Sequence, residues 1–212
     1  MKKPYFITFE GPEGSGKSTQ IKLLKDFFAK AGYNVLTTRE PGGTFAGDKI
    51  RETLLNKDCG NLEPETELFL MLAQRCEHLR KVIRPALKKG TVVLCDRYFD
   101  SSMAYQGFAR GLNPSKISEI HHAFLGDFLP DATILLHITP EKGLERAKHN
   151  GAKQLDRIES ESKEFHNKVF NGYETLAKND PQRFIELDAS GTAQELSDKI
   201  ICALKKKFTD LP

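Results

Sequence analysis

Residues 11–18 read Gly-Pro-Glu-Gly-Ser-Gly-Lys-Ser, which matches the phosphate-binding pattern G-x-x-x-x-G-K-[ST] at every fixed position. The stretch follows the short apolar run Phe6–Phe9 and precedes a segment of helical period that begins near Ser18. Glycines in such a loop let successive backbone N–H groups face an anion, and the N-terminus of the following helix adds a favourable dipole. The order strand, loop, helix therefore predicts an α/β fold that binds the phosphates of a nucleotide.

The side chains of this loop have separate expected roles. Lys17 should reach the β- and γ-phosphates of ATP, and the Ser18 hydroxyl should bind Mg²⁺. Because Lys17 would also neutralise charge on the transferring phosphoryl group, we expect it to be catalytic. The residues expected around the ATP phosphates are Gly11, Pro12, Glu13, Gly14, Ser15, Gly16, Lys17, Ser18 and Thr19. The alternative interpretation is a glycine-rich turn with an exposed lysine.

Short apolar runs alternate with longer segments of helical period along the rest of the chain. The expected strands are Phe6–Phe9, Val35–Thr38, Val92–Cys95, Thr133–Ile138 and Phe184–Leu187. Nearly continuous apolar runs are typical of strands in a parallel sheet that is covered on both faces. Apolar residues at spacings of three and four, such as Phe165, Val169 and Tyr173, indicate helices. We therefore expect one domain over residues 1–212, built on a doubly wound, five-stranded parallel sheet flanked by helices.

Arginines are concentrated in the segments that follow the expected strands, where ligands bind in folds of this kind. They are Arg39, Arg51, Arg75, Arg97, Arg110, Arg146 and Arg157. Forked guanidinium donors suit an enzyme that holds two highly charged phosphate compounds together. An acceptor phosphate is already an anion at pH 7, so no general base is required. The set favours a kinase with a phosphorylated acceptor, although for any one of these arginines taken alone an ordinary surface salt bridge is the better interpretation.

Composition argues against several other functions. The net charge of +3 is too small to indicate a nucleic-acid partner, and no guanine-reading N-K-x-D tetrad follows a strand. No stretch approaches the roughly 18 apolar residues of a membrane span, and Met1-Lys2-Lys3 leads into a strand rather than a secretion signal. Four widely spaced cysteines indicate reduced thiols. We therefore expect a cytoplasmic protein with no membrane or nucleic-acid partner.

The run Leu68-Phe69-Leu70-Met71-Leu72-Ala73 is apolar on every side of a helix. A helix of this kind is buried all round, but the sheet of a small domain covers only one of its faces. The remaining face could pack on a partner subunit, which predicts a homodimer, or it could form a slot for substrate.

A second group of motifs extends over essentially the whole chain. They are Phe9-Glu10-Gly11 with the phosphate loop, Thr38-Arg39-Glu40-Pro41-Gly42-Gly43-Thr44, Asp96-Arg97-Tyr98, Ala104-Tyr105-Gln106-Gly107, Leu155-Asp156-Arg157-Ile158-Glu159 and Asp188-Ala189-Ser190. Together they resemble the bacterial thymidylate kinase family, and adenylate and guanylate kinases look different at these places. The resemblance implies a P-loop nucleoside monophosphate kinase. Such an enzyme phosphorylates dTMP to dTDP with ATP and Mg²⁺ by direct in-line transfer, without a covalent intermediate, and so supplies dTTP synthesis.

The resemblance also implies roles at the acceptor sugar and phosphate. Glu13 matches the acidic residue that faces the sugar 3′-hydroxyl. Arg51 and Arg97 match the arginines on the acceptor phosphate, and this contact makes Arg97 a catalytic candidate. Asp96 ends a strand as an acid near Mg²⁺.

One backbone feature and one more arginine belong to the same group of implied roles. The Glu40–Pro41 bond is implied to be cis, because a cis X–Pro bond in a tight loop is kept for its geometry. This geometry would aim Arg39 toward the acceptor.

Around the acceptor base, the resemblance implies a further set of contacts. Arg75 matches the arginine that hydrogen-bonds thymine, and Ser102 and Gln106 stand where the family contacts the base. Tyr105 matches the ring that leaves no room for a ribose 2′-hydroxyl. Met71 stands where the family usually has a phenylalanine stacked on thymine. It shares a helix face with Arg75, and a thioether can pack on a pyrimidine.

The segment 142–157 matches the mobile LID that covers ATP in the family. Family members carry a catalytic arginine either in the phosphate loop or in the LID, and the variable loop positions 12–15 hold no arginine here. The chain thus resembles the LID type, with Arg157 as the first candidate and Arg146 as the second for contact with the transferring phosphoryl group.

Two other functions stay open on the sequence. One is a kinase of the same fold with a different acceptor, such as another pyrimidine monophosphate or a deoxynucleoside. The other is a nucleotide-binding switch that transfers no phosphoryl group to a small molecule. A panel of acceptors would distinguish them.

Overall fold

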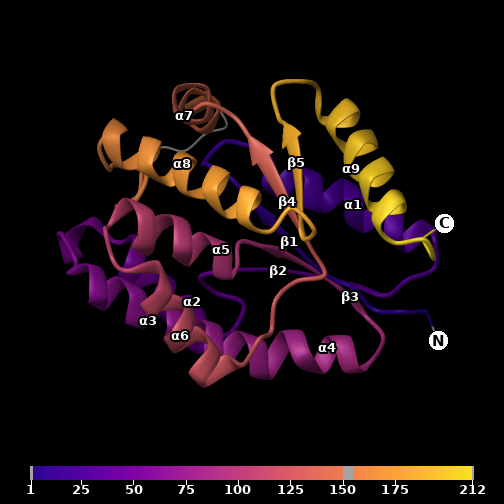
Figure 1. The fold of residues 1–212 in the computed structure, drawn as a ribbon, viewed down its shortest axis with the longest axis horizontal. Coiled ribbons are helices and arrows are strands. Elements are labelled where there is room, and N and C mark those ends of the chain that lie inside the picture. Colours follow the sequence, from indigo (N-terminus) through magenta and orange to yellow (C-terminus); the bar gives the residue numbers. More distant parts are fainter. Residues whose placement is uncertain (1, 150–154, 212) are drawn as a thin grey trace.

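A parallel sheet lies at the centre of the protein (Figure 1). The computed structural model describes residues 2–149 and 155–211, and within these ranges five strands pair in the order β2-β3-β1-β4-β5. The strands are β1 Phe6–Glu10, β2 Val35–Arg39, β3 Val92–Asp96, β4 Ala132–His137 and β5 Phe184–Asp188. All the expected strands are confirmed, with ends that differ by no more than one residue, and so is the α/β fold.

Helices cover both faces of this sheet. Two of them, α1 (Lys17–Lys30) and α9 (Ala193–Lys207), lie together on one face, and α8 (Lys163–Asn179) lies on the other (Figure 1). The remaining helices are α2 Phe45–Leu55, α3 Pro64–His78, α4 Arg84–Lys88, α5 Phe99–Ser102, α6 Pro114–Leu125 and α7 Pro140–His149. Short helical turns of other pitch are η1 Lys57–Cys59, η2 Leu79–Ile83 and η3 Met103–Ala109, the last two of π type.

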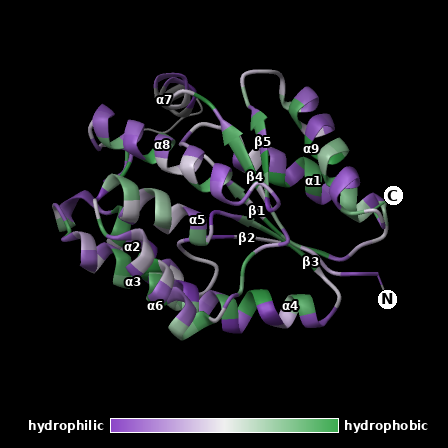
Figure 2. Cartoon of the chain, in the orientation of Figure 1, coloured by the Kyte–Doolittle hydropathy of each residue, from purple (hydrophilic) through white to green (hydrophobic). Residues whose placement is uncertain are grey.

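The hydrophobic core lies on both sides of the sheet because successive strand residues face opposite ways. Ile7 of β1 packs in the cluster that contains Leu24 of α1 and Ile200 of α9. Its neighbour Phe6 packs in the cluster on the other face, with Leu72 of α3. Figure 2 shows the apolar colour concentrated in the strands, while the helices are banded with polar residues. The carboxyl ends of β1, β3 and β4 are thereby fixed side by side at one edge of the sheet.

Helix α3 buries only part of its apolar run. Leu68 and Leu72 are buried in the core, and Met71 is buried beside a cavity described below. Phe69, by contrast, is 58% exposed. The apolar run of α3 was expected to contact either a partner subunit or a substrate. Its residues differ in this respect: Met71 lines the cavity, whereas Phe69 is exposed on the outside of the molecule.

Among residues 2–149 and 155–211, no helix has both the length and the apolar character required to cross a membrane.

Candidate active site

The phosphate-binding loop closes around the lysine side chain. β1 ends at Glu10 and α1 begins at Lys17, so the loop occupies the turn between them. The Lys17 ammonium donates hydrogen bonds to the backbone oxygens of Gly11 at 3.1 Å and Pro12 at 2.9 Å. Burial, followed by the charge of Arg97, lowers the pKa of Lys17. A third hydrogen bond, of 3.5 Å, goes to the Ser15 hydroxyl. A buried ammonium held by these neutral oxygens is suited to receive a more strongly charged partner such as a phosphate.

The loop also touches the first helix of the expected LID. Gly14 has a φ of +69°, which L side chains rarely adopt, and a Cβ built on it would overlap the carbonyl oxygen of Gly143 in α7. A Cβ on Gly143 would in turn overlap the carbonyl oxygen of Glu13. Backbone therefore packs directly on backbone between the loop and α7.

The expected metal ligands are adjacent. The Ser18 hydroxyl donates a hydrogen bond of 3.2 Å to a carboxylate oxygen of Asp96. Asp96 ends β3, directly beside Phe9 of β1 in the sheet register. A hydroxyl and a carboxylate are the hard oxygen donors that Mg²⁺ prefers, so this pair fits the ion that a nucleotide triphosphate would bring.

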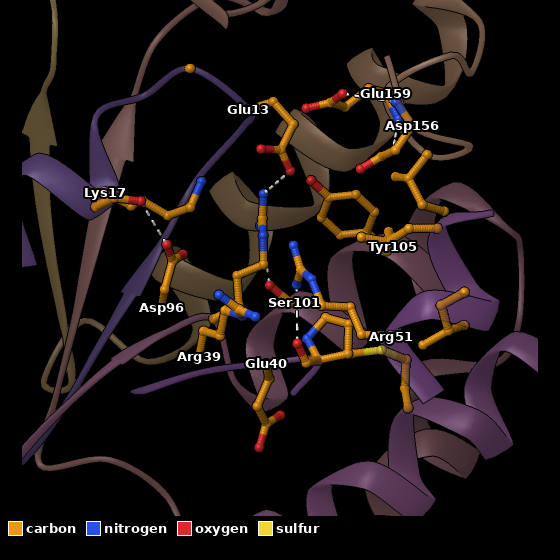
Figure 3. Close-up of a pocket in the computed structure, with 18 of the residues that line it drawn as sticks. Glu13, Lys17, Arg39, Glu40, Arg51, Asp96, Ser101, Tyr105, Asp156 and Glu159 are labelled. Carbon is orange, nitrogen blue, oxygen red and sulfur yellow. Dashed lines mark hydrogen bonds and ion pairs between the residues drawn. The ribbon is translucent and has the colours of Figure 1, made fainter. Parts of the chain in front are cut away.

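A cavity of about 470 Å³ opens between the phosphate loop and helices α2 and α3, with η3 as a further wall (Figure 3). This volume lies in the range of small-molecule sites. The expected site residues that line it are Glu13, Gly14, Gly16, Lys17, Ser18, Thr19, Arg39, Arg51, Met71, Asp96, Arg97, Tyr105 and Gln106. Figure 3 shows Glu13 and Tyr105 turned toward the centre, whereas the carboxylate of Glu40 points away from it.

Arg97 links the two sides of this cavity. Its φ of +68° is unusual for a residue with a side chain. One guanidinium nitrogen contacts Glu13 at 2.5 Å and the other contacts the Tyr173 hydroxyl at 3.0 Å. The guanidinium lies over the Tyr105 ring, 5.1 Å from its centroid. Burial alone would raise the pKa of Glu13, but Arg97 and Lys17 hold it down at about 2. The site thus contains a fixed positive charge beside a carboxylate that stays ionised.

The loop after β2 supplies the other acceptor-side cations. The Glu40–Pro41 bond is cis, as expected. Arg51 of α2 donates a hydrogen bond of 3.0 Å to the Pro41 carbonyl oxygen, and Arg39 lies at the mouth of the cavity with its side chain 58% exposed. Arg39, Arg51 and Arg97 therefore face one space in which an anion would be surrounded by guanidinium groups.

Two residues expected at the base, Arg75 and Ser102, lie behind the cavity wall and are outside its lining in the described chain. Arg75 is completely buried and pairs with Glu40 at 2.7 Å, the Tyr98 carbonyl oxygen at 2.9 Å and the Ser102 hydroxyl at 3.0 Å. His78 holds the second oxygen of Glu40 at 2.9 Å. Burial raises the pKa of Glu40, but Arg75 and His78 outweigh it and keep the pKa below its usual value. This buried group fixes the Arg75 guanidinium in place.

The two LID candidates also lie outside the cavity lining of the described chain. Arg157 is buried and donates to the Leu54 carbonyl oxygen at 2.8 Å and to Glu67 at 2.7 Å. Arg146 of α7 donates to the carbonyl oxygen of Ala189 at 2.7 Å, in the loop after β5. Residues 150–154 of the expected LID lie outside the described residues.

Several residues of this site have no role predicted from the sequence. Glu67, Ser101, Asp156 and Glu159 all line the cavity. Glu67 was detectable, because it stands four residues before Met71 and so shares its helix face. Asp156 and Glu159 belong to the motif at residues 155–159, but neither matches a sequence pattern for binding a ligand.

Glu10 is a further residue that the sequence did not single out. Its buried carboxylate accepts hydrogen bonds from the Tyr98 backbone N–H at 2.8 Å, the Ser101 hydroxyl at 2.6 Å and the Tyr173 hydroxyl at 2.9 Å. Burial, reinforced by Asp100, raises its pKa. Glu10 therefore ties β1, α5 and α8 together directly behind Arg97.

A parallel sheet with a phosphate loop after its central strand, facing guanidinium groups across one cavity, defines a nucleoside monophosphate kinase of the P-loop fold. The thymidylate kinase family model matches residues 9–200. The thymidylate kinase of Protochlamydia amoebophila is 45% identical over 98% of this chain and 95% of its own length. That of Thermomicrobium roseum is 47% identical over 92% of each chain. The crystal structure of thymidylate kinase from Ehrlichia chaffeensis matches with a TM-score of 0.79 and 30% identity, over 97% of this chain and all of that one. The chain belongs to the thymidylate kinase family.

Proposed function

We propose that this protein phosphorylates dTMP to dTDP with ATP as the phosphoryl donor, and so supplies dTTP synthesis. The main support for this proposal is the cavity, whose lining contains the phosphate loop together with Arg39, Arg51 and Arg97. A donor triphosphate on the loop and an acceptor monophosphate on the arginines would meet within that one space. Membership of the thymidylate kinase family supports dTMP as the acceptor.

The chain's own groups supply positioning and charge, which are the main needs of phosphoryl transfer. Lys17 neutralises oxygens of the transferring group, and Arg97 and Arg51 hold the acceptor phosphate as its attacking oxygen approaches in line. Because that oxygen is already anionic near pH 7, no side chain has to remove a proton. Glu13 pairs with Arg97, and its proposed role is to face the sugar 3′-hydroxyl of the acceptor.

A magnesium ion, when bound with ATP, supplies additional positive charge to the phosphate oxygens. Ser18 and Asp96 would hold it, since their oxygens already lie 3.2 Å apart.

Apolar and polar residues of the cavity lining support a pyrimidine as the acceptor base. Met71 and Tyr105 offer a thioether and a ring as packing surfaces, and Gln106 offers an amide. Arg75 stands behind them with one guanidinium nitrogen, Nη1, unpaired in the described part of the chain. The Tyr105 ring lies under the Arg97 guanidinium, and its proposed role is to exclude a ribose 2′-hydroxyl.

A substrate panel tests this function directly. Production of ADP is measured with dTMP, dUMP, UMP, CMP, AMP and thymidine as acceptors. The proposal requires the largest kcat/KM for dTMP and a clear preference for dUMP over UMP. Higher activity on another monophosphate or on thymidine would transfer the assignment to a different kinase. ATP binding without transfer to any acceptor would favour a nucleotide switch.

Arg157→Lys tests the proposed catalytic arginine of the LID segment. The substitution keeps the charge but removes the guanidinium fork. In the transition state Arg157 would exchange Glu67 for a phosphoryl oxygen, so we expect kcat to fall by more than about tenfold with little change in KM for ATP. The matched variant is Arg146→Lys, assayed in parallel. A raised KM for ATP at unchanged kcat would make Arg157 a binding residue and pass the catalytic role to Arg146 or to a lysine.

We also propose that the enzyme is a homodimer that works in the cytoplasm. Phe69 on α3 supports the dimer, because a phenylalanine with 58% of its surface exposed is a typical contact residue of an apolar interface. All four cysteines, which fall in the described residues, are free, in keeping with a reducing compartment.

The dimer is tested by sedimentation equilibrium. The wild-type protein should have twice the mass of one chain, and Phe69→Glu should shift the measured mass toward that of one chain. A wild-type protein that sediments as a single chain would contradict the dimer.

A further inference from the structure

Glu67 of α3 is a buried carboxylate in the wall of the cavity, and it joins three separate segments. It is 1% exposed. One of its oxygens accepts a hydrogen bond of 2.7 Å from the side-chain amide of Gln106 in η3. The other accepts from Arg157 at 2.7 Å and from Arg110 at 3.2 Å, and Arg110 Nε also donates to the first oxygen at 3.4 Å. In the function proposed above, Glu67 is only the resting partner of Arg157 and has no role toward the acceptor base.

The charge state of Glu67 determines which way round the Gln106 amide lies. Burial raises the pKa of Glu67, but its bonds to Arg157 and Gln106 and the charge of Arg110 outweigh burial and hold the pKa below its usual value. An ionised carboxylate can only accept hydrogen bonds, so the amide has to turn its NH₂ group toward Glu67. The two orientations of an amide have the same shape, and the ionised carboxylate of Glu67 selects the one with the Gln106 NH₂ group toward it.

The other end of the same amide is left for a ligand. In the described chain, the Gln106 carbonyl oxygen, Oε1, is buried without a hydrogen-bond partner. Gln106 lines the cavity beside Met71 and Tyr105, where the base of the acceptor is proposed to lie. A buried acceptor without a partner is costly, and a ligand that offers a donor removes that cost.

We propose that Glu67 is a positioning residue that sets the choice of base by presenting the carbonyl oxygen of Gln106, and not its NH₂ group, to the acceptor. This inference rests on the proposed function. Thymine and uracil carry an N–H at N3 and can donate to that oxygen. Cytosine carries a lone pair at N3, so its nitrogen would face the oxygen without a proton between them. A site built to pair with a ligand N–H strongly rejects an analogue that lacks it.

Glu67→Gln is the direct test. The new amide has the same size and can still accept from Arg157 and Arg110, but it can also donate, so the Gln106 amide is free to turn over. The readout is the ratio of kcat/KM for dTMP to kcat/KM for 5-methyl-dCMP, two acceptors that differ only at the N3–C4 edge. We expect this ratio to fall by about tenfold or more relative to the wild-type enzyme. Both acceptors are assayed on one enzyme sample, so a partly unfolded fraction cancels from the ratio.

Two comparisons separate this role from a merely structural one. Arg110→Gln removes another partner of Glu67 and leaves the Gln106 contact intact, so its ratio should stay within about twofold of the wild-type ratio. In a Gln106→Met background, Glu67→Gln should change the ratio no further, since the amide through which it acts is gone. If Glu67→Gln does not fold, Glu67→Asp replaces it. Its shorter carboxylate would no longer reach the Gln106 amide, so the ratio should again fall below the wild-type value.

The outcomes are distinct. A wild-type enzyme that does not phosphorylate dTMP overturns the proposed function itself. An active wild-type enzyme whose selectivity ratio is unchanged by the Glu67 variants, or changed equally by Arg110→Gln, overturns the role of Glu67 and leaves the function standing.

Discussion

Lys17→Ala is expected to lower kcat by about 10³-fold while the protein stays folded, because the proposed role of its ammonium is to neutralise charge on the transferring phosphoryl group. In the described structure, the ammonium is buried and holds the carbonyl oxygens of Gly11 and Pro12. Phosphate oxygens would take the place of these neutral acceptors as the reaction proceeds. The measurement is kcat with saturating ATP and dTMP, together with a thermal melt.

Two control variants accompany Lys17→Ala. Lys17→Met keeps most of the apolar stem and removes only the charge, so it should lose nearly as much turnover. Lys22→Ala, at an exposed position of α1, should keep near wild-type kcat. Turnover close to normal in Lys17→Ala would mean that the loop at residues 11–18 is not the phosphate site.

Glu40→Ala is expected to reduce the free energy of unfolding by about 3–5 kcal/mol, because it leaves the charge of Arg75 buried without its counterion. Both partners of this ion pair are fully buried at 2.7 Å, and His78 binds the second carboxylate oxygen. Chemical denaturation at pH 7 measures the loss. Glu52→Ala is the matched control, since the Lys49–Glu52 pair is well exposed and should contribute no more than about 0.5 kcal/mol.

The lowered pKa of Glu40 predicts how the free energy of unfolding changes in acid. The folded-state pKa of Glu40 lies below the ordinary value of 4.5. Its contribution to stability is therefore complete above pH 4.5 and is lost as the pH falls through the lower folded-state pKa. Glu40→Gln has no such proton to bind, so the acid side of its stability curve should be flatter than that of the wild type. Curves of equal slope would mean that Glu40 does not contribute through its charge.

Local patterns predicted the parts of this protein that depend on local physics. The strands were recognisable because a parallel sheet covered on both faces requires nearly continuous apolar runs. The phosphate loop was recognisable because its glycines and lysine are fixed by the anion they bind. Met71 and Tyr105 came from the resemblance, and both line the cavity.

The partners of buried charges could not be predicted in this way. Arg75 is held by Glu40, and Arg157 by Glu67, across long separations in the chain. Nothing in the local sequence distinguishes an arginine that faces a ligand from one that faces a buried carboxylate. The π-helical turn of η3, which places Tyr105 and Gln106, was likewise missed, because local propensity does not signal a π turn.

The contact between Gly14 and Gly143 has a consequence for how this enzyme tolerates mutation. A saturation library at Gly14 would be expected to fail, since its φ of +69° already disfavours every other residue. Gly143 sits inside α7, and the rules for helix interiors would suggest that alanine improves it. Even one methyl group there would collide with the backbone at Glu13. A stabilising substitution chosen from helix propensity alone would thus push α7 away from the phosphate loop and damage the enzyme.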